Sequence, residues 1–199
     1  EKHKPLPLAP RPKSLDGKEV GLLPTWRPSA VEILGAVGSL LQDRYTLKGI
    51  TQEQPAREVP SRSGGLIDAL GELMDDLAHR VDVVVTSTGD RGSCTTWCSH
   101  VSTELENRGI PTVMVATDTF TNFGRRQSSL KKQPYVVITY TPNPIRQLDE
   151  NSIKQRAEAM LDTVIWGLTT PAQIIQEHNQ ELAARTIRPA GIIRASHPV

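Results

Sequence analysis

The sequence predicts an α/β fold in which helices cover both faces of a parallel sheet, giving three layers. Segments rich in β-branched residues alternate with amphipathic segments of about 12–18 residues, which is typical of βαβ units. One strand-like segment, residues 81–85, contains four valines, as expected for a parallel strand that is buried on both faces. The connections between successive parallel strands are expected to be right-handed.

The chain begins with a proline-rich arm. Residues 1–16 hold four prolines, so we expect an extended segment that lies on another surface, such as a neighbouring subunit. Residues 19–23 follow as the first predicted strand. Helical spacing of apolar residues then predicts a helix over 29–43. Its apolar positions are Val31, Leu34, Val37, Leu40 and Leu41.

The middle of the chain is expected to contain two strands and two helices. A short strand over 45–50 leads into a polar loop over 51–65. A helix over 66–80 and the strand over 81–85 come next, and residues 86–95 are expected to form a loop. The following helix ends near Gly109, a typical C-terminal signal. The first of these helices has one apolar face, made of Leu66, Leu70, Leu73, Met74 and Leu77.

Two further strands and two helices are expected in the last part of the chain. The strands cover 110–117 and 135–139, and residues 118–126 are expected to form a loop between them. A long helix over 149–168 and a helix from Pro171 to about Arg185 precede a tail over 187–199. We divide the chain into a proline-rich arm (1–16), an α/β domain (17–170) and a C-terminal helix and tail (171–199) that contacts another subunit.

The composition is ordinary for a soluble protein and excludes several classes. The net charge of +1 gives no strong field for nucleic acid or a membrane surface. No apolar run reaches the roughly 20 residues of a membrane span, and the first residues lack the apolar region of a signal peptide. Two cysteines four positions apart cannot staple a secreted fold, which favours the cytoplasm. No cofactor motif is evident; a metal or an external thiol reductant stays open.

Ligands of such sheets bind beyond the carboxyl ends of the strands, where four loops are expected to converge: 25–27, 86–95, 118–126 and 140–146. The loop over 86–95 leads to Cys94. A thiol at the start of a helix meets the positive end of the helix dipole and free backbone N–H groups, which favour the thiolate. Cys94 is therefore the predicted nucleophile or redox thiol.

Cys98 and Asp118 complete the predicted catalytic group. Two cysteines four apart on a helix have Cβ atoms about 5–6 Å apart, wider than the roughly 3.5–4.5 Å of a disulfide. Cys98 is either a replacement resolving thiol or core packing in line with Val101 and Leu105. Asp118 follows a strand, so it is a candidate general acid or base, or a loop cap.

Further residues around Cys94 are candidates for substrate binding. Small polar residues of this loop can cap a helix or cradle an anion, and Arg91 can pair with a carboxylate or face solvent. Trp97 either walls the pocket or packs in the core. The five histidines are too scattered to suggest a metal site. The predicted substrate-binding residues are Asp90, Arg91, Gly92, Ser93, Thr95, Trp97 and Asn122.

Gly92-Ser93-Cys94 after the valine-rich strand resembles the UGSC family of selenoproteins and their cysteine homologues, roughly over residues 15–170. Members carry selenocysteine or cysteine followed by Gly-Ser-Cys. The segments 109–120 and 140–144 also fit the family. The resemblance implies a relationship to the selenoprotein subunits of glycine- and proline-type reductases, which cleave bonds reductively with a selenol–thiol pair. In this chain Arg91 stands at the selenocysteine position.

These observations predict an enzyme that uses Cys94 on a small substrate containing a carboxylate or carbonyl group. The expected reaction is reductive cleavage, or cleavage of a C–N, C–S or similar bond. A cysteine-dependent hydrolase or lyase without redox chemistry is one alternative; a non-catalytic scaffold subunit of a hetero-oligomer is the other. We expect a homo- or hetero-oligomer, the second with a paralogous subunit. A pKa of Cys94 well below about 8.5 would favour an enzyme, and a buried, unreactive thiol a scaffold.

Overall fold

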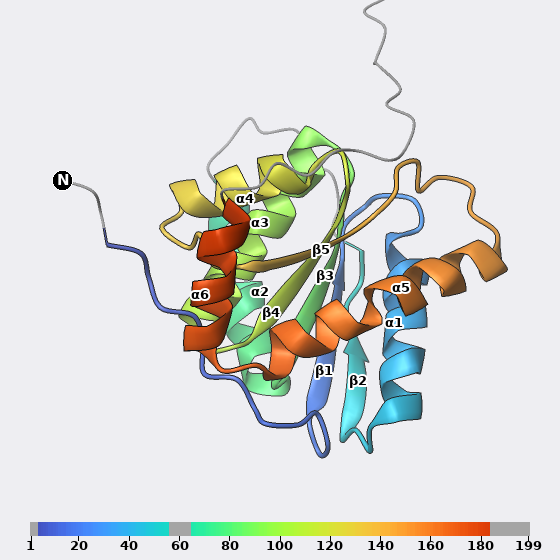
Figure 1. Cartoon of the computed structure of the whole chain (residues 1–199), viewed down its shortest axis with the longest axis horizontal. Helices are drawn as coiled ribbons and strands as arrows, with labels where there is room; N and C mark the ends of the chain where they lie inside the picture. Colours follow the sequence, from blue (N-terminus) through green and yellow to red (C-terminus); the bar gives the residue numbers. More distant parts are fainter. Residues whose placement is uncertain (1–3, 56–64, 184–199) are drawn as a thin grey trace, which may run out of the picture.

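The computed structural model describes the backbone of residues 4–55 and 65–183, and the side chains of residues 4–55 and 71–181. It is the predicted three-layer α/β fold (Figure 1). Five parallel strands form one sheet in the order β2-β1-β3-β4-β5. The strands are β1 (Glu19–Pro24), β2 (Gly49–Gln52), β3 (Val83–Gly89), β4 (Thr112–Thr117) and β5 (Val137–Thr141).

Helices cover both faces of this sheet. α1 and α5 pack on one face, and α2, α3 and α4 on the other (Figure 1). Each face has its own apolar core: Ile33 of α1 and Val164 of α5 belong to one, and Met74 of α2 and Leu105 of α3 to the other. The helices are α1 (Ala30–Arg44), α2 (Gly65–Arg80), α3 (Gly92–Asn107), α4 (Thr121–Leu130), α5 (Glu150–Thr169) and α6 (Ala172–Ala183).

The central strand β3 fixes where the cysteine-bearing helix begins. All its residues are buried, and it pairs with β1 and β4. The strand continues to Gly89, beyond the predicted end at Val85, with a register shift against β4 between Ser87 and Gly89. Only two residues therefore separate β3 from α3, and Cys94 lies inside the first turn of the helix instead of in a loop.

Helix α4 was not predicted: the expected loop over 118–126 is wrong from Thr121 onward. The buried face of α4 consists of small residues, among them Gly124 and Ser128. A Cβ atom at Gly124 would lie 3.2 Å from Ile138 and 3.4 Å from Thr95, so the helix packs closely on its neighbours. Because the buried positions carry no large apolar side chains, the sequence shows no row of Leu, Ile or Val at helical spacing, and the helix is easily missed.

The other elements differ from the prediction mainly at their ends. Val31 of α1 is 39% exposed, while Ile33, absent from the predicted face, is fully buried. The predicted strand over 45–50 shortens to β2, because its first residues connect α1 to the sheet. Met74 and Leu77 of α2 are buried as predicted. The side chains of Leu66 and Leu70 lie outside the described part of the chain.

The C-terminal helices follow the prediction closely. The side chain of Asp149 caps α5 by accepting the N–H of Ser152 at 2.7 Å, and α6 ends at Ala183. The tail over 187–199 and most of the loop over 51–65 fall outside the described residues. None of the helices described could reach across a bilayer with an apolar segment.

The proline-rich arm packs against its own chain. Its described part, residues 4–16, runs beneath the amino ends of the strands (Figure 1), and the side chain of Leu15 is fully buried. Arg11 pairs with Glu106 at the end of α3, at 2.6 Å, and both side chains are 0% exposed. The carboxylate of Glu106 also accepts the N–H groups of Ala9 (2.8 Å) and Thr112 (2.9 Å). One buried carboxylate thus joins the arm, α3 and β4.

Replacing this carboxylate is expected to destabilise the protein strongly. Glu106→Ala leaves the guanidinium of Arg11 buried without its partner, which costs about 3–5 kcal/mol. Urea unfolding should show that loss in the free energy of unfolding, and limited trypsin digestion should cut the arm faster. The control is Glu104→Gln, which removes a more exposed ion pair with Arg108 and should cost about 0–1 kcal/mol. Equal losses in both variants would contradict the assigned role.

Candidate functional site

A buried ion pair joins the loops that follow β1 and β3 at their carboxyl ends. The guanidinium of Arg27 contacts both carboxylate oxygens of Asp90, with Nε 2.8 Å from Oδ1 and 3.0 Å from Oδ2. The two side chains are only 9% and 5% exposed. The pairing of Arg27 with both oxygens fixes the carboxylate in one orientation.

The thiol of Cys94 lies against this carboxylate. Cys94 is fully buried, and its S–H donates to Oδ1 of Asp90 at 3.0 Å. The backbone N–H of Arg91 donates to the same sulfur at 3.1 Å. Arg27, Asp90 and Cys94 therefore form a continuous chain of polar contacts from the end of β1 to the first turn of α3.

This environment raises the pKa of the Cys94 thiol to about 11. Burial is the largest cause, followed by the hydrogen bond to Asp90 and its negative charge; backbone N–H groups act in the opposite direction. The position at the start of α3 alone predicts a thiolate, but burial and the carboxylate outweigh the helix end. At neutral pH the resting form is a thiol.

Backbone and hydroxyl contacts hold the end of β1 against β3. The hydroxyl of Thr25 accepts the N–H of Thr88 at 3.2 Å, and the N–H of Thr25 donates to the carbonyl of Ser87 at 2.6 Å. Thr25 and Thr88 are both buried. These contacts place Arg27 within reach of Asp90.

Cys98 lies one turn further along α3, inside the core. It packs with Met114 and Ala116 and is fully buried. The hydroxyl of Thr86 lies 3.6 Å from its sulfur, and burial raises the pKa of the Cys98 thiol. Since both cysteines are on a regular helix, an internal disulfide would require the first turn of α3 to unwind.

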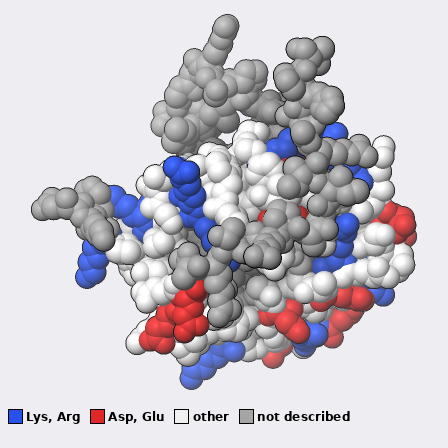
Figure 2. All heavy atoms as spheres, turned by 45° about the horizontal axis from the view of Figure 1, so that its top comes forward, with Lys and Arg blue, Asp and Glu red and all other residues white. Residues whose placement is uncertain are grey.

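The exposed residues beside Cys94 belong to the start of α3. Arg91, Gly92 and Ser93 are exposed, whereas Thr95 is buried and donates its hydroxyl to the carbonyl of Arg91 at 2.6 Å. Asp90, the acidic residue next to Arg91 in the sequence, pairs with Arg27. Figure 2 turns the side of the molecule at the carboxyl ends of the strands toward the reader. In that view the acidic side chains gather mainly along the lower edge.

Two tryptophans make a further contact between the loop after β1 and helix α3. Trp97 of α3 is half-buried, and its ring meets the ring of Trp26 edge to face, with centroids 6.3 Å apart. The pair connects the loop after β1 to α3 a second time. Trp97, predicted either to wall the pocket or to pack in the core, thus makes a packing contact with Trp26.

Asp118 lies at the end of the neighbouring strand β4 and organises loops. Its side chain is almost fully buried, and Oδ1 accepts the N–H groups of Thr119 (2.9 Å) and Asn143 (3.0 Å). Arg156 of α5 donates to the hydroxyl of Thr141 at 3.1 Å and to the carbonyl of Pro142. Burial lowers the pKa of Arg156, and the charge of Asp118 acts in the opposite direction.

The structure brings only some of the predicted residues together. Asp90 and Cys94 are in direct contact, and the backbone of Arg91 completes their group. Asn122 lies elsewhere, in a groove beside β5. Across the described residues, no group of three or more His, Cys, Asp or Glu side chains could hold a metal ion.

Arg27 is the main residue that the sequence analysis missed. The loop over 25–27 was expected at this edge, but no role was given to its arginine. The sequence does contain a signal for this ion pair. β1 and β3 are neighbours in the sheet, and the loop after β1 carries an arginine while the loop after β3 carries an aspartate. Adjacent strand ends that supply an arginine and an aspartate are candidates for such a pair.

One comparison with known proteins gives a match. Over residues 1–170 the chain matches the model of the UGSC family. The matched range includes the arm, all five strands of the sheet and the Arg27–Asp90–Cys94 group, and α6 lies beyond it. No curated protein matches the chain.

The raised pKa of Cys94 predicts how the rate of its alkylation depends on pH. Since only the thiolate reacts, iodoacetamide should label Cys94 at pH 7.5 about 100-fold more slowly than a thiol with the ordinary pKa of 9.0. The rate should rise about tenfold per pH unit between pH 7 and 10. Peptide mass spectrometry after timed labelling measures this, with the urea-unfolded chain as control. A plateau below pH 9 would contradict the assignment.

Proposed function

Because the chain belongs to the UGSC family, we propose that it is an enzyme that uses Cys94 on a small substrate containing a carboxylate or carbonyl group. One observation carries the proposal: the thiol of Cys94 is hydrogen-bonded to the carboxylate of Asp90 at 3.0 Å. The pair lies at the carboxyl ends of parallel strands, where α/β proteins bind their ligands.

Asp90 acts as the base that activates the thiol. A nucleophile that is protonated at rest needs an adjacent proton acceptor within hydrogen-bonding distance. The S–H proton passes to Oδ1 of Asp90 as the sulfur attacks the substrate. Arg27 holds the carboxylate in place through both oxygens, so it is a positioning residue.

The bond changes follow from this arrangement. The thiolate forms an S–C bond to an electrophilic carbon of the substrate, and the bond from that carbon to N, S or another leaving atom breaks. The leaving atom takes the electron pair of that bond and receives the proton from Asp90. Where the attacked carbon is a carbonyl carbon, water breaks the S–C bond by hydrolysis and restores the Cys94 thiol. In a reductive version an external dithiol attacks the sulfur of Cys94, the carbon leaves with the electron pair of the S–C bond and takes a proton, and the second thiol of the reagent reduces the mixed disulfide. Asp118, directly after the neighbouring strand β4, stays a candidate for the second proton transfer.

The exposed start of α3 supports binding of an anionic group. The guanidinium of Arg91 can pair with a carboxylate through two hydrogen bonds. The first-turn N–H groups of Gly92 and Ser93 favour negative charge at the same place. A substrate carboxylate or a developing oxyanion next to Cys94 would use both, whereas the N–H of Thr95 already donates to the carbonyl of Arg91 at 2.9 Å.

The proposal favours chemistry that needs one thiol from the protein. Arg91 stands where the resemblance to UGSC selenoproteins implies selenocysteine, so no selenol–thiol pair is available. Cys98 is fully buried in the core, a poor position for a resolving thiol. Activity that depends on an added dithiol would identify the reductive version, and activity without it a hydrolase or lyase. Two reduced thiols fit a cytoplasmic protein.

A second candidate function is that of a non-catalytic subunit in a hetero-oligomer. The specific observation in its favour is the full burial of Cys94 together with its raised pKa. In that case the Arg27–Asp90–Cys94 group would only stabilise the loops. Failure of Cys94 to react with any small electrophile in the folded protein, combined with a stable complex with a paralogous subunit, would favour this candidate.

Paired alkylating reagents test the proposed site without knowledge of the substrate. Iodoacetate and iodoacetamide differ in one carboxylate, so an anion site beside Cys94 should favour iodoacetate. We expect the ratio of their rates at Cys94 to exceed the ratio in the unfolded chain by about tenfold or more, the worth of one charge-assisted hydrogen bond. Timed labelling at pH 8.5 with peptide mass spectrometry gives both rates.

Two arginine variants test whether Arg91 causes the preference for iodoacetate. Arg91→Gln should return the ratio nearly to that of the unfolded chain. Arg146→Gln removes another exposed arginine at the same edge of the sheet and should leave the ratio unchanged. A folded protein without any preference for iodoacetate would refute the anion site.

Asp90→Asn separates the effect of the carboxylate on the thiol pKa from its role as base. The variant removes the negative charge that raises the pKa of Cys94. The midpoint of the iodoacetamide pH profile should therefore fall below pH 11, while turnover of a substrate, once identified, should be lost. Asp118→Asn, the matched change directly after β4, should leave the midpoint unchanged. An unaltered midpoint in Asp90→Asn would show that the carboxylate does not control the thiol.

A further inference from the structure

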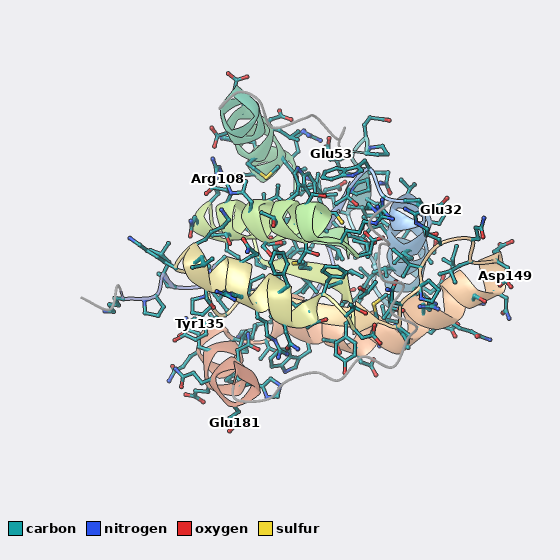
Figure 3. The ribbon with its side chains drawn as sticks, turned by 90° about the horizontal axis from the view of Figure 1, so that it is seen from above. Glu32, Glu53, Arg108, Tyr135, Asp149 and Glu181 are labelled. Carbon is teal, nitrogen blue, oxygen red and sulfur yellow. The ribbon has the colours of Figure 1, made fainter. Side chains whose placement is uncertain are left out.

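A groove of about 790 Å³ lies beside the edge strand β5, apart from the Cys94 group. Its walls are formed by α4, α5 and α6, and its floor by β5 and the residues before it. Tyr135, labelled in Figure 3, lies between the lining residues Pro134 and Val136, and its carbonyl accepts a hydrogen bond from Asn179 of α6 at 2.7 Å. The volume lies in the range of small-molecule pockets, about 300–1,000 Å³.

One wall of the groove is cationic. Arg125 and Arg126 follow each other on α4, the first half-buried and the second exposed. Burial lowers the pKa of Arg125, and the charge of Tyr140 acts in the opposite direction. Among the residues that line the groove, Asp162 carries a negative charge, and its carboxylate pairs with Arg44 on α1 at 3.0 Å. The exposed guanidinium of Arg126 can pair with an anion through two hydrogen bonds, and the positive charge of Arg125 beside it adds to the attraction.

The floor and the opposite wall are largely apolar. Val136 and Val137 are buried below the groove, and Ile138 is half-buried. On the opposite wall the ring of Trp166 meets His178 at a centroid distance of 5.0 Å. An apolar body can therefore lie on β5 and Trp166 while its charged end reaches α4.

We propose that this groove binds a small organic anion with an apolar body, held by Arg125 and Arg126 at its charged end and by β5 and Trp166 along its length. This is a second binding site, and it does not rest on the chemistry proposed for Cys94. α4 nevertheless links the two places: the hydroxyl of Ser99, on the cysteine-bearing helix, lies 3.3 Å from the carbonyl of Gly124, next to Arg125.

Titration of the whole chain with 4-phenylbutyrate and with its uncharged amide tests the proposal. Isothermal calorimetry should show saturable binding of the acid in the millimolar range or tighter, and binding of the amide should be about tenfold weaker or more. Arg126→Gln changes an exposed side chain and should weaken binding of the acid by about the same factor. Lys48→Gln removes one positive charge near the opposite edge strand and should leave the affinity unchanged.

A fluorescence measurement places the ligand. Binding should change tryptophan emission in the unaltered chain, and this change should be lost in Trp166→Phe, with folding checked by circular dichroism. Equal affinity for acid and amide, or equal affinity of Arg126→Gln and the unaltered chain, would overturn the proposal. So would a concentration-dependent dimer that Arg126→Gln dissociates, because a second copy of the chain would then occupy the groove.

Discussion

The buried contact between the guanidinium of Arg27 and the carboxylate of Asp90 determines how the functional end of the molecule is arranged. Neither charge could stay buried alone without a large desolvation cost. The loops after β1 and β3 must therefore keep the geometry that brings the two groups together. The same carboxylate accepts the thiol proton of Cys94. Stability of these loops and readiness of the sulfur for reaction thus depend on one ion pair.

Helix α3 connects this ion pair to a second one. Cys94 lies in its first turn and contacts Asp90, which is paired with Arg27 from the loop after β1. Glu106 lies in its last turn and is paired with Arg11 from the N-terminal arm. The N-terminal arm, although distant from the sulfur, consequently holds the far end of the helix that carries it. Movement of the first turn of α3 is therefore restricted by the contacts at both ends of the helix. This arrangement suits a reaction that requires a well-placed thiol rather than a mobile one.

Sequence patterns predict the layers well because the core is built from regular apolar faces, as on α5 and in the valine-rich strand β3. They fail where small side chains form the contact. Gly124 and Ser128 give α4 a close fit without a row of large apolar side chains. The thiol pKa was also beyond prediction, because the position of Cys94 at a helix start is visible in the sequence, while its burial and its contact with Asp90 depend on the folded sheet.

The ion pair of the arm also has a consequence for biosynthesis. Arg11 and Glu106 are 95 positions apart, so the ribosome needs about 5–20 s to deliver the partner of Arg11 after the arginine itself. Throughout that time the apolar side chains of Leu8 and Leu15 lack the surface that buries them in the finished protein. Chaperones that recognise short apolar segments can engage the nascent arm during this interval, and its docking marks the arrival of α3 and β4.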